Sequence, residues 1–439
     1  MITNYFKVSN IDFDKSFVIK NTKEIYINAF FIPEEYYCPK CKSYKLYKNG
    51  HCKKTVRHCV YFSKLIVVRC NFQLYKCKEC GHIFQEHDYF SPPFISLSYE
   101  SIFAIFDKLK KTNESFESVA KDLHISRQNV IDIFDRFYDY TPSPNLPEII
   151  SFDEKHIGRA ITDHKYLFIM LDWKNMKLYN ILPSRDKNTL WKYFSKIPRE
   201  IREKVKHVTM DMWEPYRDVV KTLLPNAKIA VDSFHVMKNI NTAMNKVRCS
   251  VMQKYNQKTE KLEDNSPYYY LLKKFDYFLT KELDDISSYV SVPKFKTKMS
   301  KHNLLKQLLN IDSRIEEAYR LTSKYREFNR TSNSANCIIE IEELINDFLS
   351  SSLESFNTIG RMLLNWKDEI INSFTIIDSN DNNRRLSNGP IEGINGIIEQ
   401  IKINGKGYTN YDRLKRRIIY TINKDTELKN IPNKLLRNE

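Results

Sequence analysis

A β-strand that carries an acidic residue is predicted by Glu148-Ile-Ile-Ser-Phe-Asp153-Glu-Lys-His-Ile157. The chain that follows alternates between short apolar runs and segments of helical period. It predicts, in order, a strand over 166–171, a strand over 176–182, a helix over 186–197, a strand over 207–211, a helix over 215–224, a strand over 227–231 and a helix after 232. The predicted order is therefore βββαβαβα.

This order is that of the RNase H-like α/β fold, in which the first and fourth strands are neighbours in one sheet. Asp153 lies on the first strand and Asp211 ends the fourth, so we expect the two carboxylates side by side. Mg²⁺ or Mn²⁺ prefers such oxygen ligands. Two ions about 4 Å apart can activate the attacking oxygen and stabilise the leaving oxygen of a phosphodiester. Either acid alone would more often be a solvated residue.

A third carboxylate is expected on a later helix. Asn388-Gly-Pro390 predicts a turn and a helix start. Glu392 falls in the first turn of that helix, and Glu399 is the competing choice. The buried stripe of the helix is predicted to be Ile394, Ile397, Ile398 and Ile401. Residues 239–374 have a helical pattern and predict an all-helical insertion between the fifth strand and this last helix.

Four cysteines form two pairs of identical spacing, Cys38-Pro-Lys-Cys41 and Cys77-Lys-Glu-Cys80. Two such turns can aim four thiolates at one tetrahedral Zn²⁺, and the strand-rich segment 60–74 between them favours a zinc ribbon. Disulfides and free thiols are the alternatives. Three further cysteines and two histidines lie in the same window and could substitute as ligands: Cys52, Cys59, Cys70, His51 and His58.

A helix-turn-helix is predicted by the segment 115–137, in which Ser115 and Ser126 are candidate N-caps of two amphipathic helices. His124 occupies the turn position where glycine is usual, and histidine tolerates a positive φ better than most residues. The second helix would present Arg127, Gln128 and Asn129 to base edges. An ordinary helical hairpin is the alternative.

Positive charge is concentrated in two windows of the 439-residue chain, whose net charge is +16. Residues 38–80 hold 11 Lys and Arg against one Glu, and residues 384–417 hold eight against three acids. Local surpluses of this kind favour DNA phosphates as the partner. In the second window, Arg413, Lys415, Arg416 and Arg417 are the candidate phosphate contacts, and a solvated helix face is the alternative.

The composition, 42% hydrophobic and 28% charged, excludes disordered, collagen-like and small disulfide-bonded classes. No apolar run of membrane-spanning length and no secretory signal is visible. We therefore expect a cytoplasmic protein without membrane contact.

Taken together, these motifs resemble a bacterial insertion-sequence transposase of the DDE class, in the ISL-three family. The resemblance rests on the cysteine pairs, the helix-turn-helix segment and four short motifs: Ser151-Phe-Asp153-Glu154, Thr209-Met-Asp211-Met, Asp232-Ser-Phe-His235-Val-Met-Lys and Ser387-Asn-Gly-Pro-Ile-Glu392-Gly-Ile-Asn395. It implies Asp153, Asp211 and Glu392 as the metal-binding triad, and Asp232 and His235 as active-site support. The resemblance also implies a homo-oligomer, with a dimer as the expected form, and association with the nucleoid.

The predicted architecture is α+β and multidomain. Its expected parts are a zinc ribbon over 1–90, a helix-turn-helix and linker over 91–147, an RNase H-like core over 148–238, the helical insertion over 239–374, and the last catalytic helix with a basic tail over 375–439. The expected function is binding of terminal inverted repeats, metal-dependent strand cleavage and strand transfer. A non-catalytic DNA-binding regulator and an RNase H-like nuclease without strand transfer are the rivals. Recombination through a tyrosine or serine nucleophile is a weaker option.

Overall fold

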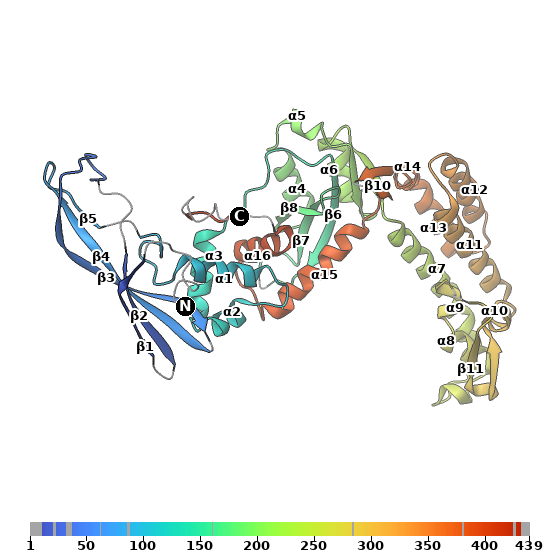
Figure 1. The fold of residues 1–439 in the computed structure, drawn as a ribbon. Coiled ribbons are helices and arrows are strands. Elements are labelled where there is room, and N and C mark those ends of the chain that lie inside the picture. The colour runs from blue at the N-terminus through green and yellow to red at the C-terminus, as the bar shows by residue number, and fades with distance from the viewer. Residues whose placement is uncertain are drawn as a thin grey trace. The chain divides into compact units, whose positions relative to one another are not determined.

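The chain folds as two compact units in a computed structural model (Figure 1). We call them the terminal unit (residues 1–142, 159–163 and 394–439) and the central unit (143–158 and 164–393). The structure describes residues 11–20, 23–31, 37–61, 63–85, 88–159, 161–282, 285–379, 382–424 and 427–431. Every helix in these ranges is too short or too polar to cross a membrane.

A five-stranded sheet forms the middle of the central unit, with the strand order β10-β9-β6-β7-β8. Its strands are β6 (Ile149–His156), β7 (Tyr166–Asp172), β8 (Lys177–Leu182), β9 (His207–Met210) and β10 (Lys228–Val231). The first three strands are antiparallel, whereas β9 pairs in parallel with both β6 and β10. The predicted neighbours, the first and fourth strands, are thus hydrogen-bonded to each other.

The helices between these strands follow the predicted order and lie where the apolar period indicated. They are α4 (Lys187–Phe194), the short α5 (Arg199–Arg202), α6 (Glu214–Leu223) and the long α7 (Ser233–Lys254). Phe152, Phe168 and Tyr216 are buried and pack edge to face in a core that continues into the helices after α7. This packing fixes β6 against β7 and α6, and so fixes the strand that carries Asp153.

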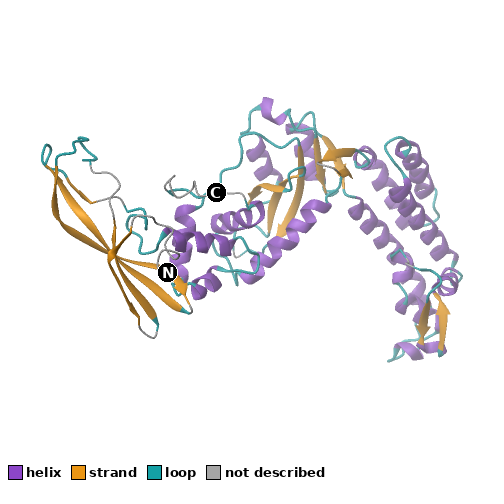
Figure 2. Cartoon of the chain, viewed as in Figure 1, coloured by secondary structure: helices purple, strands orange, loops and turns teal. Residues whose placement is uncertain are grey.

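The insertion after α7 is mostly helical: α8 (Pro267–Lys274), α9 (Tyr277–Thr280), α10 (Lys301–Leu309), α11 (Ser313–Thr331), α12 (Cys337–Leu349), α13 (Glu354–Asn365) and α14 (Lys367–Asn372). The prediction that it is all helical is wrong, because β11 (Tyr289–Val292) and β12 (Thr297–Ser300) form an antiparallel hairpin within it (Figure 2). Lys296 makes the turn with a φ of 49°. A second hairpin, β13 (Ile376–Ser379) with β14 (Asn382–Arg385), follows α14.

A second sheet, in the terminal unit, has the order β1-β2-β4-β3 with β5 on β4. Its strands are β1 (Ile11–Lys20), β2 (Glu24–Phe31), β3 (Leu46–Tyr61), β4 (Lys64–Cys77) and β5 (Ile83–Gln85). The long β3–β4 hairpin is the predicted strand region, extended at both ends. Strands β1 and β2 were not predicted from the sequence, and β2 pairs in parallel with β4.

The remaining helices of the terminal unit are α1 (Tyr99–Leu109), α2 (Phe116–Asp122), α3 (Arg127–Phe137) and α16 (Tyr411–Asn423). Phe106, Phe134 and Tyr420 form one aromatic cluster, so α16 packs on α1 and α3. Helix α15 (Gly389–Asn404) begins in the central unit and ends in the terminal unit. The predicted domain boundaries at 90, 147, 238 and 374 stay predictions.

Candidate active site and nucleic-acid interface

Asp153 and Asp211 lie close together, as the strand order requires. One carboxylate oxygen from each of Asp153, Glu154 and Asp211 lies within 4.8 Å of the other two. Burial raises the pKa of Asp153 to about 7, and the negative charge of Asp211 adds to the effect. An acid whose charged form is disfavoured by a neighbouring carboxylate gains from a bound cation, so this pair fits a divalent metal ion.

Glu154 is an addition to the predicted set. Its carboxylate pairs with Arg185 and accepts a hydrogen bond of 3.2 Å from the Tyr216 hydroxyl. These partners occupy both carboxylate oxygens of Glu154. The only sign of its role in the sequence was its position next to Asp153. Successive side chains on a strand usually point to opposite faces, so this position did not predict that Glu154 joins the cluster.

His235 carries positive charge into the cluster. It lies in the first turn of α7, and its Nε2 atom is 3.0 Å from Oδ2 of Asp211. Its Nδ1 atom is 3.6 Å from Oδ2 of Asp232, whose side chain caps α7 by accepting from the Phe234 amide. Contacts with Asp211 and then Asp232 raise the pKa of His235 to about 10. Of the predicted support pair, His235 therefore contacts the predicted metal ligand directly, and Asp232 contacts His235.

Glu392 lies in the first turn of α15, as predicted, but is outside the close cluster formed by the described acids. Burial raises the pKa of its carboxyl, and the charges of Asp232 and Asp211 act in the same direction. Glu392 therefore lies within electrostatic reach of the cluster. Three of the four predicted isoleucines on α15 are buried: Ile394, Ile398 and Ile401.

One residue of this site, Asn388, was predicted to form a turn and belongs to a quoted motif, but it was not among the predicted site residues. Asn388 precedes α15, and its side chain is buried and donates to Asp211 and to the carbonyl of Phe152. In the sequence, an asparagine directly before the start of the helix that carries Glu392 is the signal that could have identified it.

The four predicted cysteines converge in the terminal unit. The Sγ atoms of Cys38 and Cys80 are 3.6 Å apart and those of Cys41 and Cys77 are 3.5 Å apart. A tetrahedral zinc ion with Zn–S bonds of about 2.3 Å requires S–S separations of about 3.8 Å, so the thiols fit this ion. Desolvation acts to raise the pKa of Cys38, but backbone hydrogen bonds at Cys41 and Lys40 together with side-chain hydrogen bonds from Cys80 and Cys41 lower it to about 7.

The two cysteine turns have the same geometry. Lys42 follows the first with a φ of 61°, and Gly81 follows the second with a φ of 68°. The Lys42 amide donates to the Cys38 carbonyl and the Gly81 amide to the Cys77 carbonyl. The surplus cysteines Cys52, Cys59 and Cys70 are not in the cluster, and burial raises the pKa of Cys70.

The predicted pair of helices in 115–137 is present, with the predicted caps. The Ser115 and Ser126 side chains accept from the amides of Ser118 and Asn129. His124 takes a φ of 52° in the turn, as expected for a residue in the glycine position. The three predicted base-contact residues, Arg127, Gln128 and Asn129, are all exposed. Gln128 donates to Asp132 one turn along.

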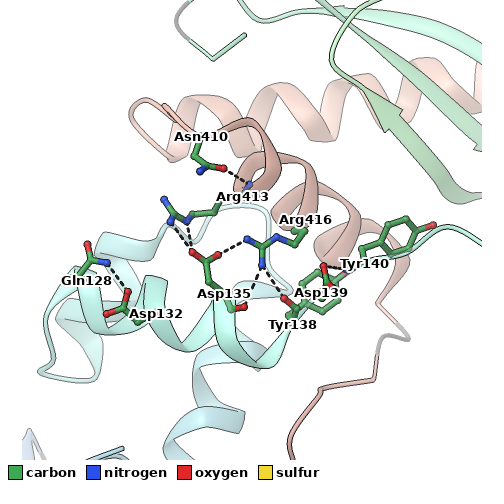
Figure 3. A network of polar contacts seen from close by, with 9 residues as sticks. All are labelled: Gln128, Asp132, Asp135, Tyr138, Asp139, Tyr140, Asn410, Arg413 and Arg416. Carbon is green, nitrogen blue, oxygen red and sulfur yellow. Dashed lines mark hydrogen bonds and ion pairs between the residues drawn. The ribbon is translucent and has the colours of Figure 1, made fainter. Parts of the chain in front are cut away.

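The basic cluster on α16 has a different environment from the one predicted. Asp135 of α3 accepts from Arg413 at 2.7 Å and from Arg416 at 2.8 Å (Figure 3). Arg416 also donates to the Tyr138 carbonyl. The pair therefore clamps α16 to α3, although both side chains keep some exposure. Lys415 is partly buried, which lowers its pKa.

Arg417 is fully buried, so the prediction that it contacts phosphate is wrong. Its guanidinium donates to the carbonyls of Leu109, Lys111 and Glu114 and to the Thr421 hydroxyl. The carbonyls at the end of a helix lack partners within it. A guanidinium that reaches them from another helix satisfies them, and burial lowers its pKa.

One family model, described as a transposase of the DDE class and the ISL3 type, matches residues 150–418, which is more than half of the chain. The matched range includes Asp153, Asp211, His235, Asn388 and Glu392. No curated protein matches the chain.

Proposed function

Because the chain belongs to the ISL-three (ISL3) family of DDE transposases, we propose that it binds the terminal inverted repeats of an insertion sequence and catalyses metal-dependent strand cleavage and strand transfer. The observation that carries this proposal is the close pair of Asp153 on β6 and Asp211 directly after β9, the parallel strand hydrogen-bonded to β6, with the pKa of Asp153 strongly raised. The family implies DNA as the partner.

In this proposal the central sheet is an RNase H-like core in which Asp153, Asp211 and Glu392 hold Mg²⁺ or Mn²⁺. The bound ions would supply Lewis-acid activation of the attacking oxygen and stabilisation of the leaving one. His235 orients the Asp211 carboxylate from one side. Asp232 holds His235 at the start of α7 and stabilises its imidazolium form.

The terminal unit supplies DNA binding in this proposal. The Cys38, Cys41, Cys77 and Cys80 thiolates would hold a structural zinc ion and close a zinc ribbon. The β3–β4 hairpin joins the two cysteine turns and exposes two of its lysines, Lys48 and Lys53. The exposed Arg127, Gln128 and Asn129 at the start of α3 would contact base edges in the major groove.

Carboxylate variants of the full-length chain test the catalytic part. We expect Asp153→Asn and Asp211→Asn to reduce Mg²⁺-dependent cleavage of the element's end to background while end binding is nearly unchanged. Wild-type cleavage by either variant would contradict the assignment of that residue.

Zinc content tests the ribbon, and substantially less than one zinc ion per chain would contradict it.

Strand transfer separates this proposal from its closest rival. A nuclease without transfer would cleave but would not join pre-cleaved ends to target DNA. We expect joining of pre-cleaved ends that depends on the same two carboxylates. A regulator derived from a transposase would bind the ends and do neither.

A further inference from the structure

The buried side-chain amide of Asn388 makes three hydrogen bonds beside the proposed carboxylates. It is 1% exposed. Its Nδ2 atom donates to the Phe152 carbonyl at 3.0 Å and to Oδ1 of Asp211 at 3.4 Å. Its Oδ1 atom accepts from the Thr209 hydroxyl at 2.9 Å. Both hydrogens and the oxygen of the amide are therefore engaged.

A chain of hydroxyls fixes the direction of these bonds. Thr209 gives its only proton to Asn388, so its oxygen accepts the proton of Ser151, which lies 2.7 Å away. Ser151 and Thr209 are themselves buried and face each other on β6 and β9. The amide is thus held in one orientation by two neighbouring strands.

The backbone of Asn388 starts the helix that carries Glu392. Its carbonyl accepts from the amides of Ile391 and Glu392. One residue therefore touches the strand position next to Asp153, the Asp211 carboxylate and the first turn that presents Glu392. With His235 on Oδ2 and Asn388 on Oδ1, both oxygens of Asp211 have a donor, which fixes the plane of that carboxylate.

We propose that Asn388 is a positioning residue that sets the spacing of Asp153, Asp211 and Glu392 for the metal ions. This inference rests on the proposed function for the identity of the carboxylates. The substitution Asn388→Asp would remove both N–H donors of the side chain and add a negative charge beside Asp211. A neutral amide is the side chain that can donate twice and accept once in this place.

The test measures Mn²⁺ binding to the full-length protein without DNA, so it does not depend on cleavage. Loss of a partner that orients a metal ligand typically lowers metal affinity about 10–100-fold. We expect a loss in this range for Asn388→Ala, which is the deciding variant, because Asn388→Asp removes both donors but also adds a negative charge that itself attracts Mn²⁺. Hydrogen exchange in residues 389–393 should accelerate in both variants, because the helix start loses its anchor.

Asn372→Ala is the matched control. Asn372 is a partly buried amide that joins α14 to the Ile229 carbonyl of β10, in the same unit but away from the carboxylates. We expect it to bind Mn²⁺ like the wild type. Thr209→Val removes the hydrogen bond to Asn388 and the acceptor of the Ser151 hydroxyl with little change of shape, and it provides the test if Asn388→Ala does not fold. It should lower Mn²⁺ affinity by a smaller factor.

Wild-type Mn²⁺ affinity in Asn388→Ala, or in Thr209→Val if the first variant is unfolded, would overturn the inference. The proposed function can fail separately. The wild-type protein could bind Mn²⁺ with an affinity that falls in Asn388→Ala and yet neither cleave nor join DNA. In that case the positioning role stands and the transposase mechanism does not.

Discussion

The carboxylates of Glu154 and Glu392 differ in their side-chain partners within the protein. Glu154 is paired with Arg185 and Tyr216 and lies in the close acidic cluster. Glu392 is exposed as a residue and lies outside that cluster, although its carboxyl has a raised pKa. For Glu154 to turn to a metal ion, its ion pair with the partly buried Arg185 guanidinium would have to break, and breaking such a pair is costly.

This contrast predicts which of the two is the third metal ligand. Glu392→Gln should reduce Mg²⁺-dependent cleavage to background, because an amide oxygen binds the ion far more weakly than a carboxylate. Glu154→Gln should retain measurable cleavage, since glutamine can still accept from Tyr216. Both variants are assayed on the same end substrate. The reverse ranking would assign the metal site to Glu154.

Removing the positive charge of Arg417 should affect stability, whereas removing that of Arg127 should affect DNA binding. Arg417→Ala should lower the free energy of unfolding by about 2–4 kcal/mol, because it leaves several buried carbonyls without donors. Arg127→Ala should leave the thermal midpoint unchanged and weaken DNA binding. Thermal unfolding and a binding titration on the same two proteins check this, and a stable Arg417→Ala with weakened binding would contradict it.

At the scale of elements, α16 completes the helical part of the terminal unit. Asp135 joins α3 to Arg413 and Arg416, and the aromatic ring of Tyr420 lies between those of Phe106 and Tyr138. The sequence predicted that this helix lies with the catalytic core. Its true neighbours were not predictable, because they lie about 300 residues away along the chain and share no sequence motif with it.

Two aspartates on α3 provide a test of this clamp. Asp135→Asn should lower the free energy of unfolding of the terminal unit by about 1–2 kcal/mol, because two guanidinium groups that are partly shielded from solvent lose a charged partner. Asp132→Asn, one turn away and exposed, should change it by less than about 0.5 kcal/mol. Hydrogen exchange in 411–423 reports the same difference, and equal effects of the two substitutions would count against the clamp.

Elements with a buried apolar run were predictable, and elements without one were not. The strands and helices from 149 to 231 were found because each apolar run is bounded by polar turns. The hairpin of β11 and β12 was missed because β11 is mostly exposed, with Tyr289 72% exposed, whereas β9 and β10 are equally short but mostly buried. Its pairing with β12 depends on the turn at Lys296 rather than on an apolar face.

At the scale of the molecule, the two basic windows have different uses. The surplus in 38–80 is largely on exposed side chains. In 384–417, Arg385 donates to Ser373 and the Asn329 carbonyl, and Arg413, Arg416 and Arg417 are engaged on α1 and α3. Charge counted along a sequence locates lysines and arginines but does not tell which of them fold inward.

DNA binding should therefore depend on salt mainly through the first window. Each phosphate contact contributes about 0.9 to the slope of log affinity against log salt concentration. Replacing the exposed Lys48 and Lys53 by glutamine should reduce that slope by up to about 1.8. The matched double variant Arg413→Gln, Arg416→Gln should leave the slope nearly unchanged, and a larger effect from this pair would show that α16 contacts DNA.

The bond between Arg417 and the Leu109 carbonyl spans 308 residues of chain. A ribosome adds about 5–20 residues per second, so about 15–60 s pass between the synthesis of these two partners. During that interval the end of α1 in the nascent chain lacks the donor that satisfies it. A chain that terminates early never receives this donor, so we expect truncated products to form an unstable DNA-binding region and to compete poorly with the full-length protein for DNA.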